Sequence, residues 1–192
     1  MRKIAALLLL ALAVPARPSG FFTPALQEGL RGILQSVPRW TTVRVRIDSG
    51  AGTFYDITEP ALDLRFSGNR SSRNHFSFSG RADGRFLSLT ADPSGATPEE
   101  GYTLWGSGVD LDIRRSGGGY YVSGSIDNKS VTFSLSRLGQ RDFNIWGQGG
   151  LNLHSANYNG QETILDGSID LSQCDKKELS LISMVVAVVS AP

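Results

Sequence analysis

Apolar and polar residues alternate with a period of two along most of the chain from residue 41 onward. Val43, Val45 and Ile47 are separated by polar residues, and similar alternation recurs over 62–66, 109–113 and 131–135. Such alternation is typical of a strand with one buried and one solvated face. Clusters of turn-forming residues separate the runs, at 67–69, 82–84, 116–119, 127–129 and 157–160. The pattern predicts a mainly β protein, with antiparallel meanders in a single β domain over 41–192.

One segment before the strands has a helical period instead. Apolar residues over 21–37 recur at spacings of three and four, and Thr23 followed by Pro24 is typical of a helix N-cap and first turn. Gly29 and Gly32 weaken this helix, so it would depend on docking against another surface. The pattern predicts one N-terminal amphipathic helix.

The apolar segment 179–189 alternates only at its start and is then apolar on both faces. We expect a final strand that is covered on both sides. The alternative is an exposed edge that serves association or membrane contact. The segment is too short for a membrane-spanning helix.

Parts of the strand region resemble one another. Residues 105–111 match 146–153, and 123–127 match 166–170, with a degenerate earlier copy. Gly80, Gly124 and Gly167 hold the same place in the copies and lie 44 and 43 residues apart. We expect approximate repeats at 62–90, 105–137 and 146–185; chance similarity among glycine-rich strands is the alternative.

The shared glycines and tryptophans suggest how the sheet is shaped. Each glycine has the parity of its apolar neighbours, so it would leave a dent in the packing face, which the tryptophans are expected to fill. Three units are too few for a β-propeller, which needs about four. We therefore expect one curved sheet or a partly closed barrel, with the N-terminal helix against its concave side.

The concave apolar face is the predicted binding site. We expect Phe78, Trp105, Val122 and Trp146 to line it and to hold the amphipathic helix or an apolar ligand such as a lipid chain. A filled core without a ligand is the alternative.

The first residues have the pattern of an export signal. Arg2 and Lys3 precede an apolar run over 4–14, and Val14 and Ala16 are the small residues expected before a cleavage site. We expect 1–16 to be a signal peptide and the protein to be exported to a periplasmic or extracellular space. An uncleaved anchor is the alternative, although the run is short for one.

The composition limits the classes of molecule that the protein is expected to bind. The chain of 192 residues has 19 basic and 18 acidic side chains, and cleavage would leave 17 and 18. Without a positive excess or cluster, nucleic acid is not an expected partner. Cys174 is the only cysteine, so it forms no internal disulfide and is a buried small residue or an accessible thiol.

Candidate chemistry is sparse. His75 and His154 are the only histidines, and the chain lacks a strand-to-helix nucleophile elbow and a phosphate-binding glycine loop. Asp110 and Asp112 lie on one strand face, where they would suit a glycosidase or, with Asp127, a calcium site; a solvated face is the simpler interpretation. We expect no catalytic residue, metal or cofactor.

These observations favour an exported, non-enzymatic envelope or secreted β protein that holds an apolar ligand or an envelope protein partner. The first alternative is a small outer-membrane barrel of about eight to ten strands, although most alternating runs are shorter than the 9 to 11 residues that membrane strands need. The second alternative is a carboxylate-dependent enzyme acting on glycosides.

Overall fold

The computed structural model describes residues 40–50, 53–95, 100–147 and 150–191. The predicted signal peptide and the predicted helix at 21–37 lie outside these residues. The described part contains twelve strands, a short 3-10 helix and one α-helix. Their bounds are β1 Trp40–Gly50, β2 Phe54–Glu59, η1 Pro60–Leu62, β3 Leu64–Arg70, β4 Phe76–Ala82, β5 Arg85–Pro93, β6 Gly101–Gly106, β7 Val109–Ser116, β8 Gly119–Ile126, β9 Lys129–Arg137, β10 Phe143–Gly147, β11 Leu151–Tyr158, β12 Glu162–Asp170 and α3 Lys176–Val189.

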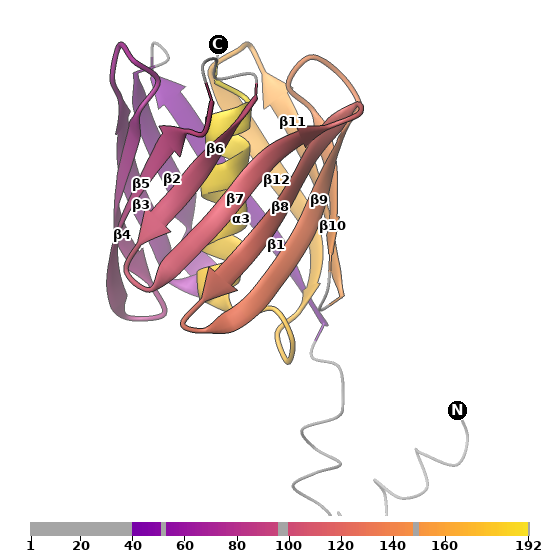
Figure 1. Ribbon diagram of the computed structural model, residues 1–192. Helices are drawn as coiled ribbons and strands as arrows, with labels where there is room; N and C mark the ends of the chain where they lie inside the picture. Colours follow the sequence, from indigo (N-terminus) through magenta and orange to yellow (C-terminus); the bar gives the residue numbers. More distant parts are fainter. Residues whose placement is uncertain (1–39, 51–52, 96–99, 148–149, 192) are drawn as a thin grey trace, which may run out of the picture. The chain divides into compact units, whose positions relative to one another are not determined.

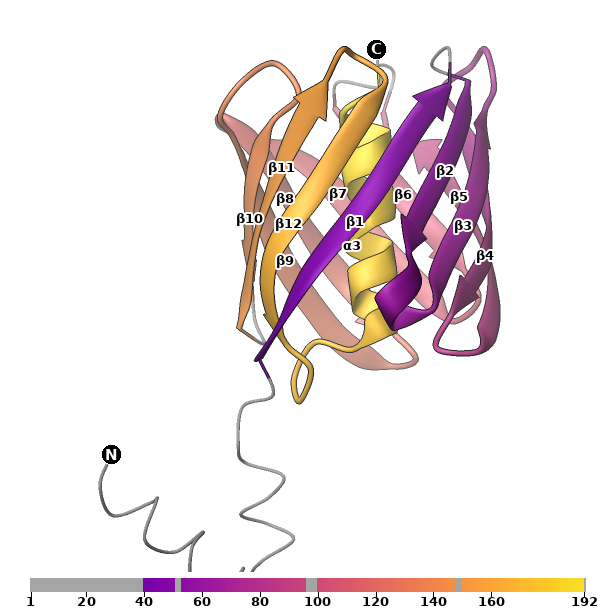
Figure 2. The same cartoon turned by 180° about the vertical axis from the view of Figure 1, so that it is seen from behind.

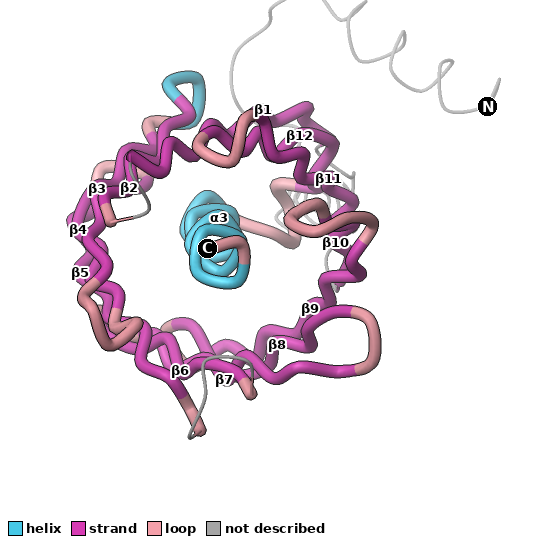
Figure 3. Tube along the Cα trace, turned by 90° about the horizontal axis from the view of Figure 1, so that it is seen from above, coloured by secondary structure: helices cyan, strands magenta, loops and turns pink. Residues whose placement is uncertain are grey.

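The strands form a closed antiparallel barrel. Each strand pairs with the next in the chain, and β1 pairs with β12 from Trp40 opposite Asp170 to Asp48 opposite Glu162. Figures 1 and 2 show the wall from opposite sides, and Figure 3 shows the complete ring. Strand content and antiparallel order are as predicted, whereas the curved sheet or partly closed barrel is corrected to full closure. Closure pairs both edge strands, so neither is left open to another chain.

The alternation seen in the sequence becomes the inside and outside of this barrel. In β1, Val43, Val45 and Ile47 are buried, whereas Arg44 and Arg46 are exposed. Side chains alone fill the interior of an eight-stranded barrel, but the diameter grows with strand number. A twelve-stranded barrel therefore has room for a further element.

That element is α3, which corrects the predicted final strand at 179–189. The helix runs along the inside of the barrel, and every residue from Glu178 to Val189 is buried (Figure 3). A helix surrounded on all sides is apolar all round, which explains a segment that is apolar on both faces. Burial was predicted correctly, but a strand is not possible here because the closed barrel has no edge with which it could pair. Among the described residues, no helix is both long and apolar enough to cross a bilayer.

Polar contacts hold the start of α3 at one end of the barrel, which we call the lower rim. Lys177 Nζ lies 2.9 Å from Asp127 Oδ2, Lys176 Nζ lies 3.0 Å from Asp83 Oδ1, and Lys129 Nζ lies 3.2 Å from Glu178 Oε1. The hydrogen bond from Lys177 keeps the pKa of Asp127 below its usual range. The helix therefore enters at the lower rim and ends at the opposite end, which we call the mouth (Figure 1).

The turn predicted at 67–69 is wrong, because these residues continue β3. Gly68 faces the interior, and a Cβ atom there would lie 2.7 Å from Cε1 of Phe78. The glycine thus makes room for an aromatic ring instead of forming a turn.

The three glycines of the predicted repeats share one structural role. A Cβ atom would lie 2.6 Å from the Cα of Phe66 at Gly80, 2.9 Å from that of Leu111 at Gly124, and 3.0 Å from that of Leu153 at Gly167. Each glycine therefore permits the close approach of a neighbouring strand. The tryptophans do not fill these places, so that expectation is wrong; the repeats themselves stay a prediction.

Candidate functional site at the mouth of the barrel

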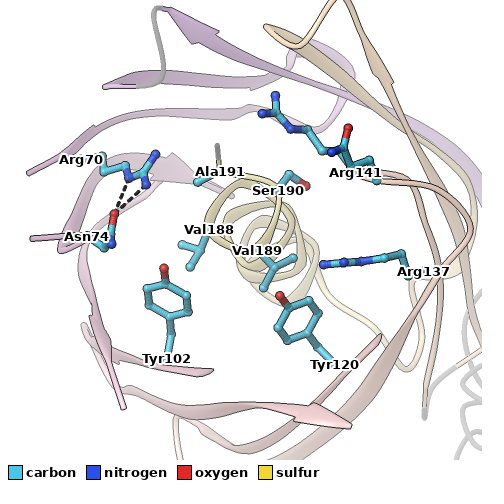
Figure 4. A pocket seen from close by; sticks show the side chains of 11 residues that line it. Arg70, Asn74, Tyr102, Tyr120, Arg137, Arg141, Val188, Val189, Ser190 and Ala191 are labelled. Atoms are coloured by element: carbon cyan, nitrogen blue, oxygen red, sulfur yellow. Dashed lines mark hydrogen bonds between the residues drawn. The ribbon is translucent and has the colours of Figure 1, made fainter. Parts of the chain in front are cut away.

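A partly open cavity of about 450 Å³ lies at the mouth, above the end of α3 (Figure 4). Helix residues make its floor, and the ends of strands and the loops between them make its wall. The lining residues are Arg70, Asn74, Tyr102, Tyr120, Arg137, Gln140, Arg141, Val188, Val189, Ser190 and Ala191. This volume is in the range of small-molecule sites.

The strand period explains why polar side chains gather here. Arg70 has the parity of the inward-facing Leu64 and Phe66 in β3, and Arg137 has the parity of Phe133 and Leu135 in β9. Each arginine is thus the last inward position of its strand, at the level where α3 ends.

Tyr102 and Tyr120 hold the corresponding places at the starts of β6 and β8. The inward-facing residues of these strands are therefore apolar inside the barrel. At the mouth, where water can reach them, they are arginines and tyrosines with polar end groups.

Each of the three guanidinium groups contacts a neutral group. Nε and Nη2 of Arg70 donate to Asn74 Oδ1 at 2.9 and 2.6 Å, and Nη1 of Arg141 donates to the carbonyl oxygen of Gly160 at 3.0 Å. The Arg137 guanidinium lies 5.8 Å from the centroid of the Phe143 ring, a cation–π contact. None of the described lining residues is acidic. The described lining residues therefore give the mouth a net positive charge.

The tyrosines add neutral hydroxyl groups on fixed rings. The Tyr102 ring lies 5.7 Å from that of Phe76 in an edge arrangement, and the Tyr120 ring lies 6.1 Å from that of Phe143. Burial raises the pKa of Tyr102, and the nearby Arg70 opposes this rise only in part. The Tyr102 hydroxyl is thus protonated at neutral pH and can donate a hydrogen bond.

Ser190 supplies a further polar atom. It is the C-cap of α3 and is 9% exposed. Its Oγ has no hydrogen-bond partner among the described residues. Figure 4 shows this side chain at the end of the helix, on the side of Arg141. Because an unpaired buried hydroxyl costs free energy, Ser190 marks a place where a ligand atom would be stabilised.

The barrel wall separates the residues predicted to line a concave face. Phe78 and Val122 are buried in the interior, whereas Trp105 and Trp146 are 49% and 48% exposed on the outer face. Trp105 Nε1 donates to Asp92 Oδ2 at 2.7 Å, and His75 Nδ1 lies 2.6 Å from Asp92 Oδ1. The structure thus does not bring the four residues into one site.

The other chemical candidates also lie outside the mouth. Asp110 and Asp112 are on the outer face of β7, where Asp112 forms an ion pair with Arg114. Asp127 binds Lys177 at the lower rim, and His154 contacts Asn144 on the outer wall. The described residues contain no group of three or more His, Cys, Asp or Glu side chains that could hold a metal ion.

The mouth residues were missed at the sequence level. The sequence does carry a pattern that points to them. In β3, β6, β8 and β9 an arginine or tyrosine with the parity of the buried residues stands at one end of the strand. Which of these strand ends lie around one cavity depends on closure of the barrel.

Comparison of the chain with models of protein families, with curated proteins and with solved structures finds no match.

Proposed function

We propose that this is an exported, non-enzymatic protein that binds a small molecule in the mouth of its barrel. The observation that carries the proposal is the cavity of about 450 Å³, in which charged, hydroxyl and apolar side chains converge above the end of α3. Convergent polar groups beside an apolar surface are a feature of small-molecule sites. Export is proposed from the pattern of residues 1–16 alone.

Because the interior of the barrel is filled, we propose the ligand site at the mouth instead of on the concave face. Phe78 and Val122 already belong to a core that packs around α3. An apolar ligand among them would have to displace the helix, whereas the mouth lies above it. For the same reason, membrane contact through 179–189 would require α3 to leave the barrel. An envelope protein partner stays a prediction.

The outer-membrane barrel is the second candidate, because a closed antiparallel barrel is compatible with it. A membrane barrel needs an apolar outer band about 25 Å tall, in which an arginine costs about 2–4 kcal/mol at the midplane. Charged residues are exposed along the outer wall here, namely Arg44, Arg46, Arg65, Arg81, Asp110 and Asp166. This outer face favours an aqueous space.

The carboxylate-dependent enzyme is the weakest candidate. Asp110 and Asp112 are neighbours on one face of one strand, and Arg114 pairs with Asp112. This arrangement is equally typical of a solvated strand face.

Native mass spectrometry tests the proposed function. We expect protein purified from its exporting host to carry a noncovalent small-molecule adduct. Ala191→Trp should remove the adduct, because the larger side chain fills the cavity from its floor. Ala156→Trp is the matched control. Ala156 lies on the outward face of β11, so this variant should keep the adduct. A bare mass for the unmodified protein, or an adduct that Ala191→Trp leaves unchanged, would contradict the proposal.

A further inference from the structure

We propose that the mouth recognises an oxyanion, a phosphate or carboxylate group, on the molecule that it binds. This inference rests on the proposed function, in which the mouth is the ligand site. It names the chemistry of the ligand through the groups of Arg70, Arg137, Arg141, Tyr102 and Ser190.

The first argument is charge. Three guanidinium groups from β3, β9 and the loop after β9 reach one cavity, and no described lining residue is acidic. The described contacts of Arg137 and Arg141 are an aromatic ring and a backbone carbonyl oxygen, neither of which carries a negative charge. An oxyanion in this cavity would offset part of the positive charge and accept charge-assisted hydrogen bonds from guanidinium groups.

The end of α3 accounts for only a small part of this positive charge. A helix C-terminus carries about half an elementary negative charge, and α3 has no basic residue of its own in its last turn. One guanidinium would be enough to balance it. Among the described lining residues, the remaining positive charge favours an anionic ligand.

The second argument is the hydrogen-bonding character of the mouth. The buried Ser190 hydroxyl lacks a partner among the described residues, and the Tyr102 hydroxyl is a protonated phenol that can donate a hydrogen bond. Together with the guanidinium groups they present mainly donors. Carboxylates and phosphates present mainly acceptors, so the two sets are complementary.

The third argument is size. A cavity of about 450 Å³ is larger than a single phosphate ion, and Val188, Val189 and Ala191 give it an apolar floor. The oxyanion is therefore part of a larger molecule whose remainder contacts the floor.

The test uses four probes: inorganic phosphate, octyl phosphate, octanoate and uncharged 1-octanol. We expect octyl phosphate and octanoate to bind, measured by calorimetry and by shifts of the Ser190 and Ala191 amide signals in NMR spectra. Inorganic phosphate should bind more weakly at the same signals, since it lacks an apolar part. Octanol binding as tightly as octanoate, or an absence of anion binding at these signals, would overturn the inference.

Arginine variants locate the site. Arg137→Gln and Arg141→Gln should each weaken octyl phosphate binding at least about tenfold, and Arg137→Lys should weaken it less because the charge stays. Arg114→Gln, which removes a guanidinium from the outer wall, is the control and should bind normally. Equal affinities in all four variants, with circular dichroism showing that each is folded, would refute the inference.

The two proposals fail in different ways. If the purified protein carries an uncharged adduct that Ala191→Trp removes, and the anionic probes do not bind, the oxyanion inference fails and the proposed function stands. If there is no adduct and no probe binds at the mouth, both fail.

Discussion

At the scale of single residues, burial decides chemical behaviour, and Cys174 is the clearest case. Cys174 as a residue is 3% exposed, in the turn between β12 and α3. Burial raises the pKa of Cys174 to about 12, and the negative charges of Glu178 and Asp175 add to the rise. Of the two possibilities left open by the sequence, a buried small residue and an accessible thiol, the structure shows the first.

We expect Cys174 to be unreactive in the folded protein at pH 8. The thiolate is the reactive form, and both burial and the raised pKa suppress it. Reaction with an aromatic disulfide reagent, followed by absorbance, should be slow in buffer and fast in denaturant. Equal rates in the two conditions would contradict the burial of this thiol.

The raised pKa of Cys174 also makes the stability of the protein depend on pH. Because the folded pKa lies above the unfolded value of about 9, folding favours the protonated thiol. The stabilisation is complete below pH 9 and is lost as the pH rises from about 9 to 12. Cys174→Ala should therefore reduce the alkaline loss of stability in this window.

At the scale of elements, the start of α3 is the feature that the sequence analysis missed. Asp175 Oδ1 accepts from the Glu178 backbone N–H at 2.8 Å, and Glu178 Oε2 accepts from the Asp175 N–H at 2.8 Å. This reciprocal pair is a capping box, visible in the sequence as Asp175 and Glu178 before an apolar run. Valines and the initial alternation favoured a strand instead, since β-branched residues are common in strands.

Asp175→Ala should lower the free energy of unfolding by about 1 kcal/mol, because it leaves an N-terminal amide of α3 without its acceptor. Asp166→Ala, which removes an exposed carboxylate from β12, is the control and should change stability by less than about 0.5 kcal/mol. Urea unfolding followed by circular dichroism measures both. Similar losses in the two variants would show that the cap does not stabilise the helix.

At the scale of the whole molecule, the closed barrel wall has apolar residues on its inner face and charged residues on its outer face. The inward rows pack around α3, and the outward rows carry charged residues on several strands. A water-filled membrane pore would require the opposite arrangement. The ends also differ, since ion pairs hold α3 at the lower rim and the cavity lies at the mouth.

Cell fractionation checks the consequence of this sorting. We expect the protein in the aqueous fraction without detergent, with the same gel mobility before and after heating. An authentic outer-membrane barrel from the same host serves as the control for pelleting and for the mobility shift. Co-sedimentation with that control, together with a heat-dependent shift, would favour the outer-membrane alternative.

The candidate site shows how far sequence patterns reach. The parity of Arg70 and Arg137 follows from their own strands, so an inward direction at a strand end could have been predicted. That both line one cavity could not be predicted, because they lie 67 positions apart in the chain and the number of strands decides how the wall curves between them. The prediction for Trp105 and Trp146 failed because they were expected to fill the dents left by the glycines, whereas strand parity places both on the outer face.

The antiparallel strands and most of their turns can be predicted from the sequence, because alternation and turn chemistry act between residues that are close in the chain. Tertiary structure alone decided three things. It paired β1 with β12, it placed the helix 176–189 inside the barrel, and it brought the arginines to one cavity at the mouth. The physical reason is that each of the three depends on closure: a closed wall offers no edge for another strand, encloses space that a helix must fill, and brings distant strand ends together.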